Sequence, residues 1–354
     1  MLLQETTQVV VTQSKPNAKA AIGPRRPINL ALQGGGAHGA FTWGVLDYLL
    51  EKNQFDIEGI SGTSAGAMNA IALAQGYLDG GAKGARKALR RFWEEVAHRN
   101  PLRSLPSLPG DSAPAPMKLF TLLSQVLSPE QWNPSDINPL RDIIDEQFDF
   151  EALATESKLK LFIAATHANS GKLRLFRNKE LTREALLASA CLPTLHKAIY
   201  IDGEPYWDGG FSANPAIYPL YFECDCNDIL LVLLSPIFHK TDPESAAEIK
   251  LRAMDIGFNA AFLREMSSFA RLMDFFEGKA SPTGELERRT IDTRFHLIEA
   301  EEFLGELASG SRLNAKADFF ERLFKHGRKK AAKWAKDCMA NVGLKGTDLA
   351  LFAA

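Results

Sequence analysis

The stretch "FDIEGISGTSAGAMNAIALAQ", residues 55–75, decides the fold because a glycine-rich turn joins two different hydrophobic patterns within it. Its first part, 55–62, is a candidate β-strand. Its second part continues as "AGAMNAIALAQGYL" (65–78), which predicts a helix of small residues able to pack closely on a sheet. Between them, Gly62-Thr63-Ser64-Ala65-Gly66 fits the pattern G-x-S-x-G.

A G-x-S-x-G motif between a strand and a helix is typical of a nucleophile elbow. The tight turn exposes the serine Oγ, and glycines at the flanking positions avoid collisions with the strand and the helix. The helix N-terminus adds partial positive charge where an oxyanion would form. We therefore expect Ser64 to be a nucleophile, supported by Gly62 and Gly66. The alternative is a glycine-rich turn that carries an inert serine.

A second glycine cluster lies upstream, in "NLALQGGGAHGAF" (29–41). Gly34, Gly36 and Gly39 fit G-x-G-x-x-G, the fingerprint of a loop that cradles a dinucleotide pyrophosphate. Glu58 follows Gly39 by 19 residues, where a dinucleotide fold carries its ribose-binding acid. This pattern alone indicates a nucleotide-binding regulatory protein.

The elbow gives the same cluster another role. A serine hydrolase needs backbone N–H groups aimed at the developing oxyanion, and an HGGG-type loop after an earlier strand is one way to supply them. Gly34, Gly35 and Gly36, with Ala37 beside them, offer amides without side-chain obstruction. Because an elbow stands where a nucleotide fold would continue into an ordinary crossover, the sequence favours the oxyanion hole.

Repeated strand–turn–helix signals predict a parallel α/β core. We expect strands over 28–32, 55–62, 228–236 and 292–300, and a hairpin over 158–178. We expect helices over 40–52, 65–78, 82–98 and 182–193, the last stopped by Pro193.

The chain is predicted to divide into a flexible tail (1–26), a catalytic α/β domain (27–240) and a mainly helical C-terminal region packed on the core (241–354). The proline-rich insertion over 100–140 is either a long connection or a lid, since "MKLFTLLSQVL" (117–127) offers apolar side chains.

The base that would activate Ser64 is less obvious from the pattern. No histidine lies in a strand-end loop with turn chemistry; the candidates are His167, His196, His239, His296 and His326, of which His196 is the best placed. The carboxylate signal is clearer, because "EPYWDGGFSANPA" presents Asp208 before Gly209 and Gly210. A partly desolvated aspartate against the serine can take its proton directly. Taken alone, Asp-Gly-Gly is usually only a tight turn.

Three motifs in this order, "GGGAHG", "GTSAG" and "DGG", resemble the signature of the patatin-like phospholipases. "LLASACLP" and "WDGGFSANPAIYPL" are similar to that family's third and fourth blocks, so the resemblance covers about 28–235. It implies a three-layer α/β/α sandwich around a mainly parallel sheet, lipid acyl-ester hydrolysis, and a Ser–Asp dyad in place of a triad.

Carried over by position, the resemblance makes Ser64 the nucleophile and Asp208 the base, with the oxyanion hole at Gly34, Gly35, Gly36 and Ala37. The family often has Arg or Lys where this chain has His38. His38 would anchor the loop or contact an anionic headgroup only when protonated.

Composition sets further limits. The chain has 354 residues, 45% hydrophobic and 24% charged, with a net charge of −2, which argues against electrostatic nucleic-acid binding. Cys191, Cys224, Cys226 and Cys338 have no C-x-x-C spacing, so we expect free thiols, no metal and no cofactor. With neither a typical secretory signal nor an apolar run long enough to span a bilayer, we expect a cytoplasmic protein, either soluble or peripheral to a membrane.

The segment over 318–339 has apolar residues at helical spacing and seven Lys and Arg residues over much of its remaining surface. It is either an interfacial helix that contacts the membrane transiently or a helix packed on the core with a solvated basic face.

The sequence therefore predicts a phospholipase A or lysophospholipase that acts on a lipid substrate. The alternatives are a carboxylesterase or acyl-thioesterase, the nucleotide-binding protein above, and a catalytically silent lipid-binding scaffold.

Overall fold

The structure is a computed structural model of the chain, and it describes residues 25–100, 127–239, 242–276, 284–305, 307 and 311–353. The expected N-terminal tail and most of the insertion over 100–140, with its amphipathic helix, lie outside the described residues. Within the described ranges, no helix is long and apolar enough to cross a membrane.

The described chain forms one eight-stranded sheet with helices on both faces. The strands are β1 (Arg26–Leu32), β2 (Phe55–Thr63), β3 (Lys160–His167), β4 (Leu173–Arg177), β5 (Ile199–Ile201), β6 (Glu204–Asp208), β7 (Asp228–Leu233) and β8 (Arg294–Glu299). The helices are α1 (Gly39–Lys52), α2 (Ala65–His98), α4 (Pro129–Trp132), α5 (Pro139–Gln147), α6 (Phe150–Thr155), α7 (Arg183–Ser189), α8 (Tyr218–Glu223), α9 (Ala246–Phe276), α10 (Glu285–Asp292), α11 (Glu301–Leu304) and α12 (Ala317–Asp337). Short 3-10 helices include η1 (Gly36–His38), η4 (Gly209–Phe211), η5 (Ser311–Leu313) and η7 (Leu349–Phe352).

The strand order is β5-β6-β3-β2-β1-β7-β8, and β4 pairs with β3. The pairs β3–β2, β2–β1, β1–β7 and β7–β8 are parallel, whereas β4 and β6 run antiparallel to β3, and β5 antiparallel to β6. The C-terminal region expected to be mainly helical thus supplies β8 to the same sheet.

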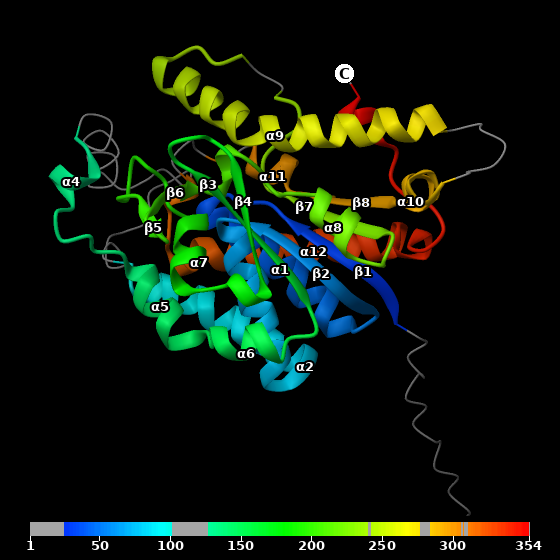
Figure 1. Cartoon of the computed structure of the whole chain (residues 1–354), viewed down its shortest axis with the longest axis horizontal. Coiled ribbons are helices and arrows are strands. Elements are labelled where there is room, and N and C mark those ends of the chain that lie inside the picture. Colours follow the sequence, from blue (N-terminus) through cyan, green and yellow to red (C-terminus); the bar gives the residue numbers. More distant parts are fainter. Residues whose placement is uncertain are drawn as a thin grey trace, which may run out of the picture.

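Two apolar layers cover the sheet because side chains of one strand alternate between its faces. In β1, Ile28, Leu30 and Leu32 pack with α1, α2 and α12, while Ala31 packs on the opposite face with α8 and α9. Figure 1 shows α9 running along one side of the sheet, with α1, α2 and α12 on the other. The expected three-layer α/β/α sandwich around a mainly parallel sheet is confirmed.

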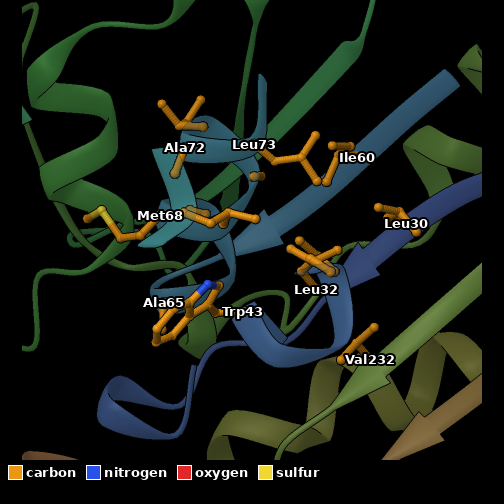
Figure 2. Close-up of a cluster of buried hydrophobic side chains, with 14 of the residues drawn as sticks. Leu30, Leu32, Trp43, Ile60, Ala65, Met68, Ala72, Leu73 and Val232 are labelled. Atoms are coloured by element: carbon orange, nitrogen blue, oxygen red, sulfur yellow. The ribbon is translucent and has the colours of Figure 1, made fainter. Parts of the chain in front are cut away.

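The centre of the larger layer lies where α2 crosses the sheet. Side chains of β1, β2 and β7 share one buried cluster with residues of α2 there, and Figure 2 shows Leu73 of α2 beside Ile60 of β2. The expected break between two helices is real, since Gly80 and Gly81 leave helical geometry inside α2. The helix expected over 182–193 is shorter, because α7 ends at Ser189.

Helix α12 buries its apolar face on α1. A Cβ added to Gly327 would lie 2.0 Å from the carbonyl oxygen of Phe41, and one added to Gly44 would lie 2.1 Å from that of Phe324. The two backbones therefore touch, and Trp43 packs on Phe324 with ring centroids 4.2 Å apart. Two predictions were made for 318–339, and the structure shows the helix packed on the core. The apolar side chains on its buried face are therefore unavailable for insertion into a membrane.

This contact predicts that Gly327→Ala destabilises the protein. A methyl group there meets the Phe41 carbonyl, so we expect the free energy of unfolding to fall by about 2 kcal/mol despite the better helix propensity of alanine. Gly257, within α9, is the control, since a Cβ there meets nothing within 4 Å. Gly257→Ala should be neutral or stabilising by up to about 1 kcal/mol in the same urea titration. A Gly327→Ala protein as stable as the wild type would contradict the close crossing.

Candidate active site

Ser64 occupies the turn between β2 and α2, as the elbow motif predicts. Its backbone has φ 54° and ψ −121°, a left-handed conformation that non-glycine residues rarely adopt. A Cβ at Gly66 would lie 2.1 Å from the carbonyl oxygen of Leu32, so the start of α2 touches the end of β1. Ser64 is partly exposed, whereas its neighbours Thr63 and Ala65 are buried.

The sheet register brings Asp208 to this turn. Ala164 of β3 pairs with Thr63 of β2 on one edge, and β4 occupies the other edge. One residue further along, Ala165 pairs with Asp208 of β6, again on the edge that β4 leaves free. Where β2 leaves the sheet for the turn at Ser64, β6 therefore takes its place beside the same edge of β3. Residues far apart in the sequence become neighbours through consecutive residues of β3.

Asp208 is nearly inaccessible, with 1% of its surface exposed. Its carboxylate accepts a 2.8 Å hydrogen bond from the N–H of Gly210, and the nearby Ser64 hydroxyl also favours its charged form. Burial raises the pKa of Asp208 to about 7, against the opposing effects of these two groups. A carboxylate with a pKa near 7 beside a serine hydroxyl has the acid–base behaviour that a general base at neutral pH would need.

Ser189, at the end of α7, binds the backbone of the elbow. This residue was not identified from the sequence. Its Oγ accepts a hydrogen bond of 3.0 Å from the backbone N–H of Ser64, and its side chain is fully buried. It lies in the "LLASACLP" block, where a polar residue within a buried apolar helix is the one available signal.

The glycine loop lies directly against the elbow, since a Cβ at Gly34 would lie 2.8 Å from the Cβ of Ser64. However, the N–H of Gly34 already donates a 2.7 Å hydrogen bond to Oδ1 of Asn214. That amide is therefore occupied, which differs from the expectation that Gly34 contributes to an oxyanion hole. Within the described part of the chain, the N–H groups of Gly35 and Gly36 donate no hydrogen bond to a side chain or to a loop carbonyl. Gly36 adopts φ +58°, which favours glycine.

Asn214 is a second residue that the sequence reasoning missed, although it lies in the quoted "DGGFSANPA" block. It is buried, and its backbone carbonyl also accepts a hydrogen bond of 3.3 Å from Nε2 of Gln33. The hydroxyl of Thr63 donates a 2.8 Å hydrogen bond to the carbonyl of Ala213. The loop after Asp208 thus binds both the glycine loop and the end of β2.

His38 lies inside the protein, with 5% of its surface exposed. Its Nε2 is 2.8 Å from Oγ of Ser311, and burial, together with the charge of Arg312, lowers the pKa of His38 to about 3. The ring is therefore neutral and bonded within the chain, whereas both predicted roles, anchoring the loop and contacting an anionic headgroup, assumed a protonated ring.

The other histidines have partners away from Ser64 or lie elsewhere. His167 bonds Glu204, His296 bonds Asp228, and His326 stacks on Phe303. His196, the best placed by sequence, is half-buried, and its buried Nδ1 has no hydrogen-bond partner within the described residues. His239 is the last residue of the described segment 127–239. None of these recorded contacts is to the elbow.

Glu58 links β2 to β3 and to the segment before β7 through its carboxylate. Its carboxylate accepts hydrogen bonds from Nζ of Lys160 at 2.8 Å and from the backbone N–H groups of Asp225 and Cys226. All four cysteines are unpaired. No cluster of His, Cys, Asp and Glu side chains suited to a metal occurs within the described ranges.

The family model described as patatin-like phospholipase matches residues 30–221. That range contains the glycine loop, the elbow and Asp208. A search of curated proteins gives no match.

Among solved structures, the chain is similar to VipD from Legionella pneumophila, with 16% identity, 88% of this chain and 67% of VipD covered, and a TM-score of 0.43. It is also similar to the type III effector ExoU, with 16% identity, 87% and 54% covered, and a TM-score of 0.30. Full-length ExoU from Pseudomonas aeruginosa, in complex with SpcU, gives 15% identity, 87% and 53% covered, and a TM-score of 0.29. The chain spans about half the length of the ExoU chains.

The burial of Asp208 predicts that Asp208→Asn stabilises the fold at alkaline pH. Because the pKa of Asp208 is raised in the folded state, ionisation costs stability above pH 7, and the cost vanishes below the ordinary pKa near 4. We expect the free energy of unfolding to rise by about 2 kcal/mol at pH 8 and to change little at pH 4. Denaturant titrations at the two pH values test this. An equal loss of stability at both would show that the carboxylate is not desolvated.

Proposed function

The chain belongs to the patatin-like phospholipase family, and from that premise we propose that it hydrolyses fatty-acyl ester bonds of lipids with Ser64 as nucleophile and Asp208 as base. The substrate class is a phospholipid or lysophospholipid. The observation that carries the proposal is that the sheet register brings the Ser64 turn to a buried carboxylate, Asp208, whose pKa burial raises to about 7.

In the proposed reaction, Oγ of Ser64 attacks the ester carbonyl carbon while Asp208 takes its proton. The tetrahedral intermediate collapses, the proton passes to the departing alcohol oxygen, and the acyl group stays on Ser64. Water then attacks the acyl-enzyme, again giving a proton to Asp208, and the fatty acid leaves as Ser64 recovers its proton. A single carboxylate serves both half-reactions because its pKa lies near neutral pH.

We assign the oxyanion hole to the backbone N–H groups of Gly35 and Gly36, with Ala37 beside them and the N-terminus of α2 behind. Gly34 has a supporting role in this assignment, because its N–H is bonded to Asn214. Gly62 and Gly66 allow the tight turn, and Gly209 and Gly210 allow the close approach after Asp208. The N–H of Gly210 also binds the base directly.

The alternatives differ in measurable ways. A carboxylesterase or acyl-thioesterase would use the same dyad, so parallel assays with short-chain esters, acyl-thioesters and phospholipids separate them by kcat/KM. A nucleotide-binding protein would need Glu58 for a ribose, yet its carboxylate is bound to Lys160 and two backbone N–H groups. Equilibrium dialysis with NAD, FAD and ATP should therefore give no tight binding. A silent lipid-binding scaffold would turn over no ester.

The central prediction is that Ser64→Ala and Asp208→Asn each abolish ester hydrolysis in a folded protein. By analogy with other serine hydrolases, the loss in kcat is at least ~10³-fold for each variant. Hydrolysis of phospholipid and of a soluble ester is the measurement, with circular dichroism to verify folding. Ser64→Ala with wild-type turnover of every acyl substrate would show that another residue is the nucleophile.

Contact with the lipid surface is assigned to the outer face of α12. With its apolar face buried on α1, the exposed residues of this helix include a row of cations: Arg322, Lys325, Lys329, Lys333 and Lys336. Such a row favours transient electrostatic contact with an anionic membrane. The proposed location is the cytoplasm, with which the unpaired cysteines are consistent.

The membrane proposal predicts that Lys329→Glu/Lys333→Glu lowers binding to vesicles of phosphatidylcholine with phosphatidylserine by at least about tenfold. Sedimentation at low ionic strength measures it. Lys172→Glu/Lys179→Glu, which makes the same charge change at two other exposed lysines, is the control. Equal binding by the two double variants would reject α12 as the contact surface.

A further inference from the structure

We propose that η5 (Ser311–Leu313) is a brace that positions the oxyanion loop, with His38 as the positioning residue that links them. This inference rests on the proposed function. It assigns a role in catalysis to a segment that lies outside residues 30–221, the range matched by the family model.

The first link is the hydrogen bond between Nε2 of His38 and Oγ of Ser311, at 2.8 Å. Both residues are buried, at 5% and 2% exposed. Nδ1 of His38 has no hydrogen-bond partner within the described residues, so Ser311 is the polar anchor of this ring. Because His38 ends η1, a displacement of its ring moves the turn that carries Gly36.

The second link is a backbone contact. A Cβ on Gly36 would lie 2.5 Å from the carbonyl oxygen of Arg312, so η5 and the glycine loop touch with no room for a side chain. The left-handed φ of Gly36 adds to this constraint. The glycine at this position is thus required by the brace as well as by the turn.

Through Arg312, η5 is also bound to residues outside the glycine loop. The guanidinium of Arg312 forms an ion pair with Asp255 of α9 and donates a 3.1 Å hydrogen bond to Oγ of Ser235, just after β7. Asp255 is 7% exposed, whereas the side chain of Arg312 is 28% exposed, so the acidic partner of this ion pair is the buried one. A continuous chain of contacts therefore runs from α9 through η5 to the amides of the oxyanion loop.

Loss of the brace should slow the chemical step of the reaction and leave substrate binding nearly unchanged. If the His38–Ser311 bond is lost, Gly35 and Gly36 are free to shift, and their N–H groups no longer point at one position. Oxyanion stabilisation is used in the transition state, so kcat falls while KM changes little. A displacement of about 1 Å at such a site costs roughly 10²-fold in rate.

The test compares Ser311→Ala, His38→Asn and His38→Gln with the wild type on a soluble ester, measuring kcat and KM separately. A glutamine amide reaches the place of Nε2, whereas an asparagine amide reaches only that of Nδ1. We expect Ser311→Ala and His38→Asn to lose about 10²-fold in kcat, with KM within about threefold. We expect His38→Gln to lose less than about tenfold, and the Ser311→Ala/His38→Asn double variant to lose no more than either single variant.

Thr290→Val is the matched control, since it also removes a buried hydroxyl, bonded at 2.8 Å to Tyr221, from the C-terminal region. It should lower thermal stability and leave kcat per folded molecule unchanged. Unchanged kcat in Ser311→Ala and His38→Asn, a rise in KM alone, or an equal loss in Thr290→Val would each overturn the brace. Failure of the proposed function itself is seen separately, as hydrolysis that survives Ser64→Ala.

Discussion

The active site depends on one constraint, the register of β3. Two consecutive residues of this strand, Ala164 and Ala165, pair with Thr63 and with Asp208 on the same edge. The point where β2 leaves the sheet is therefore the point where β6 joins it. The proposed nucleophile on the outgoing turn and the carboxylate on the incoming strand meet without either needing a long side chain. A shift of one residue in this register would point Asp208 to the opposite face of the sheet.

Close backbone contacts extend this arrangement outward. The start of α2 touches the end of β1 at Gly66, the glycine loop touches the elbow at Gly34, and η5 touches the loop at Gly36. Each contact leaves no space for a methyl group, so the amides around Ser64 are fixed by packing before any substrate arrives. Preorganised dipoles of this kind need no rearrangement during the reaction, which is why they stabilise charge effectively.

The sequence predicts the parts of this site that local geometry encodes. The elbow at Ser64 is recognisable because its strand, turn and helix are contiguous. The parallel α/β core follows from repeated strand–helix alternation, whereas the three layers were implied by the family resemblance. Asp208 needed a family resemblance, since Asp-Gly-Gly alone describes any tight turn. Asn214 and Ser189 escaped notice because their roles arise only when distant segments meet. For α12, the residue pattern does not reveal that its apolar face packs on α1, since a membrane would accept the same pattern.

The most direct test of the account is covalent labelling with a fluorophosphonate probe as a function of pH, followed by mapping of the adduct. The account predicts one adduct, on the peptide containing Ser64, formed at a rate that rises with pH and is half-maximal near 7, where Asp208 loses its proton. In Asp208→Asn the labelling should fall to background. An adduct on another residue, or labelling of Ser64 that neither depends on pH nor requires Asp208, would contradict the dyad.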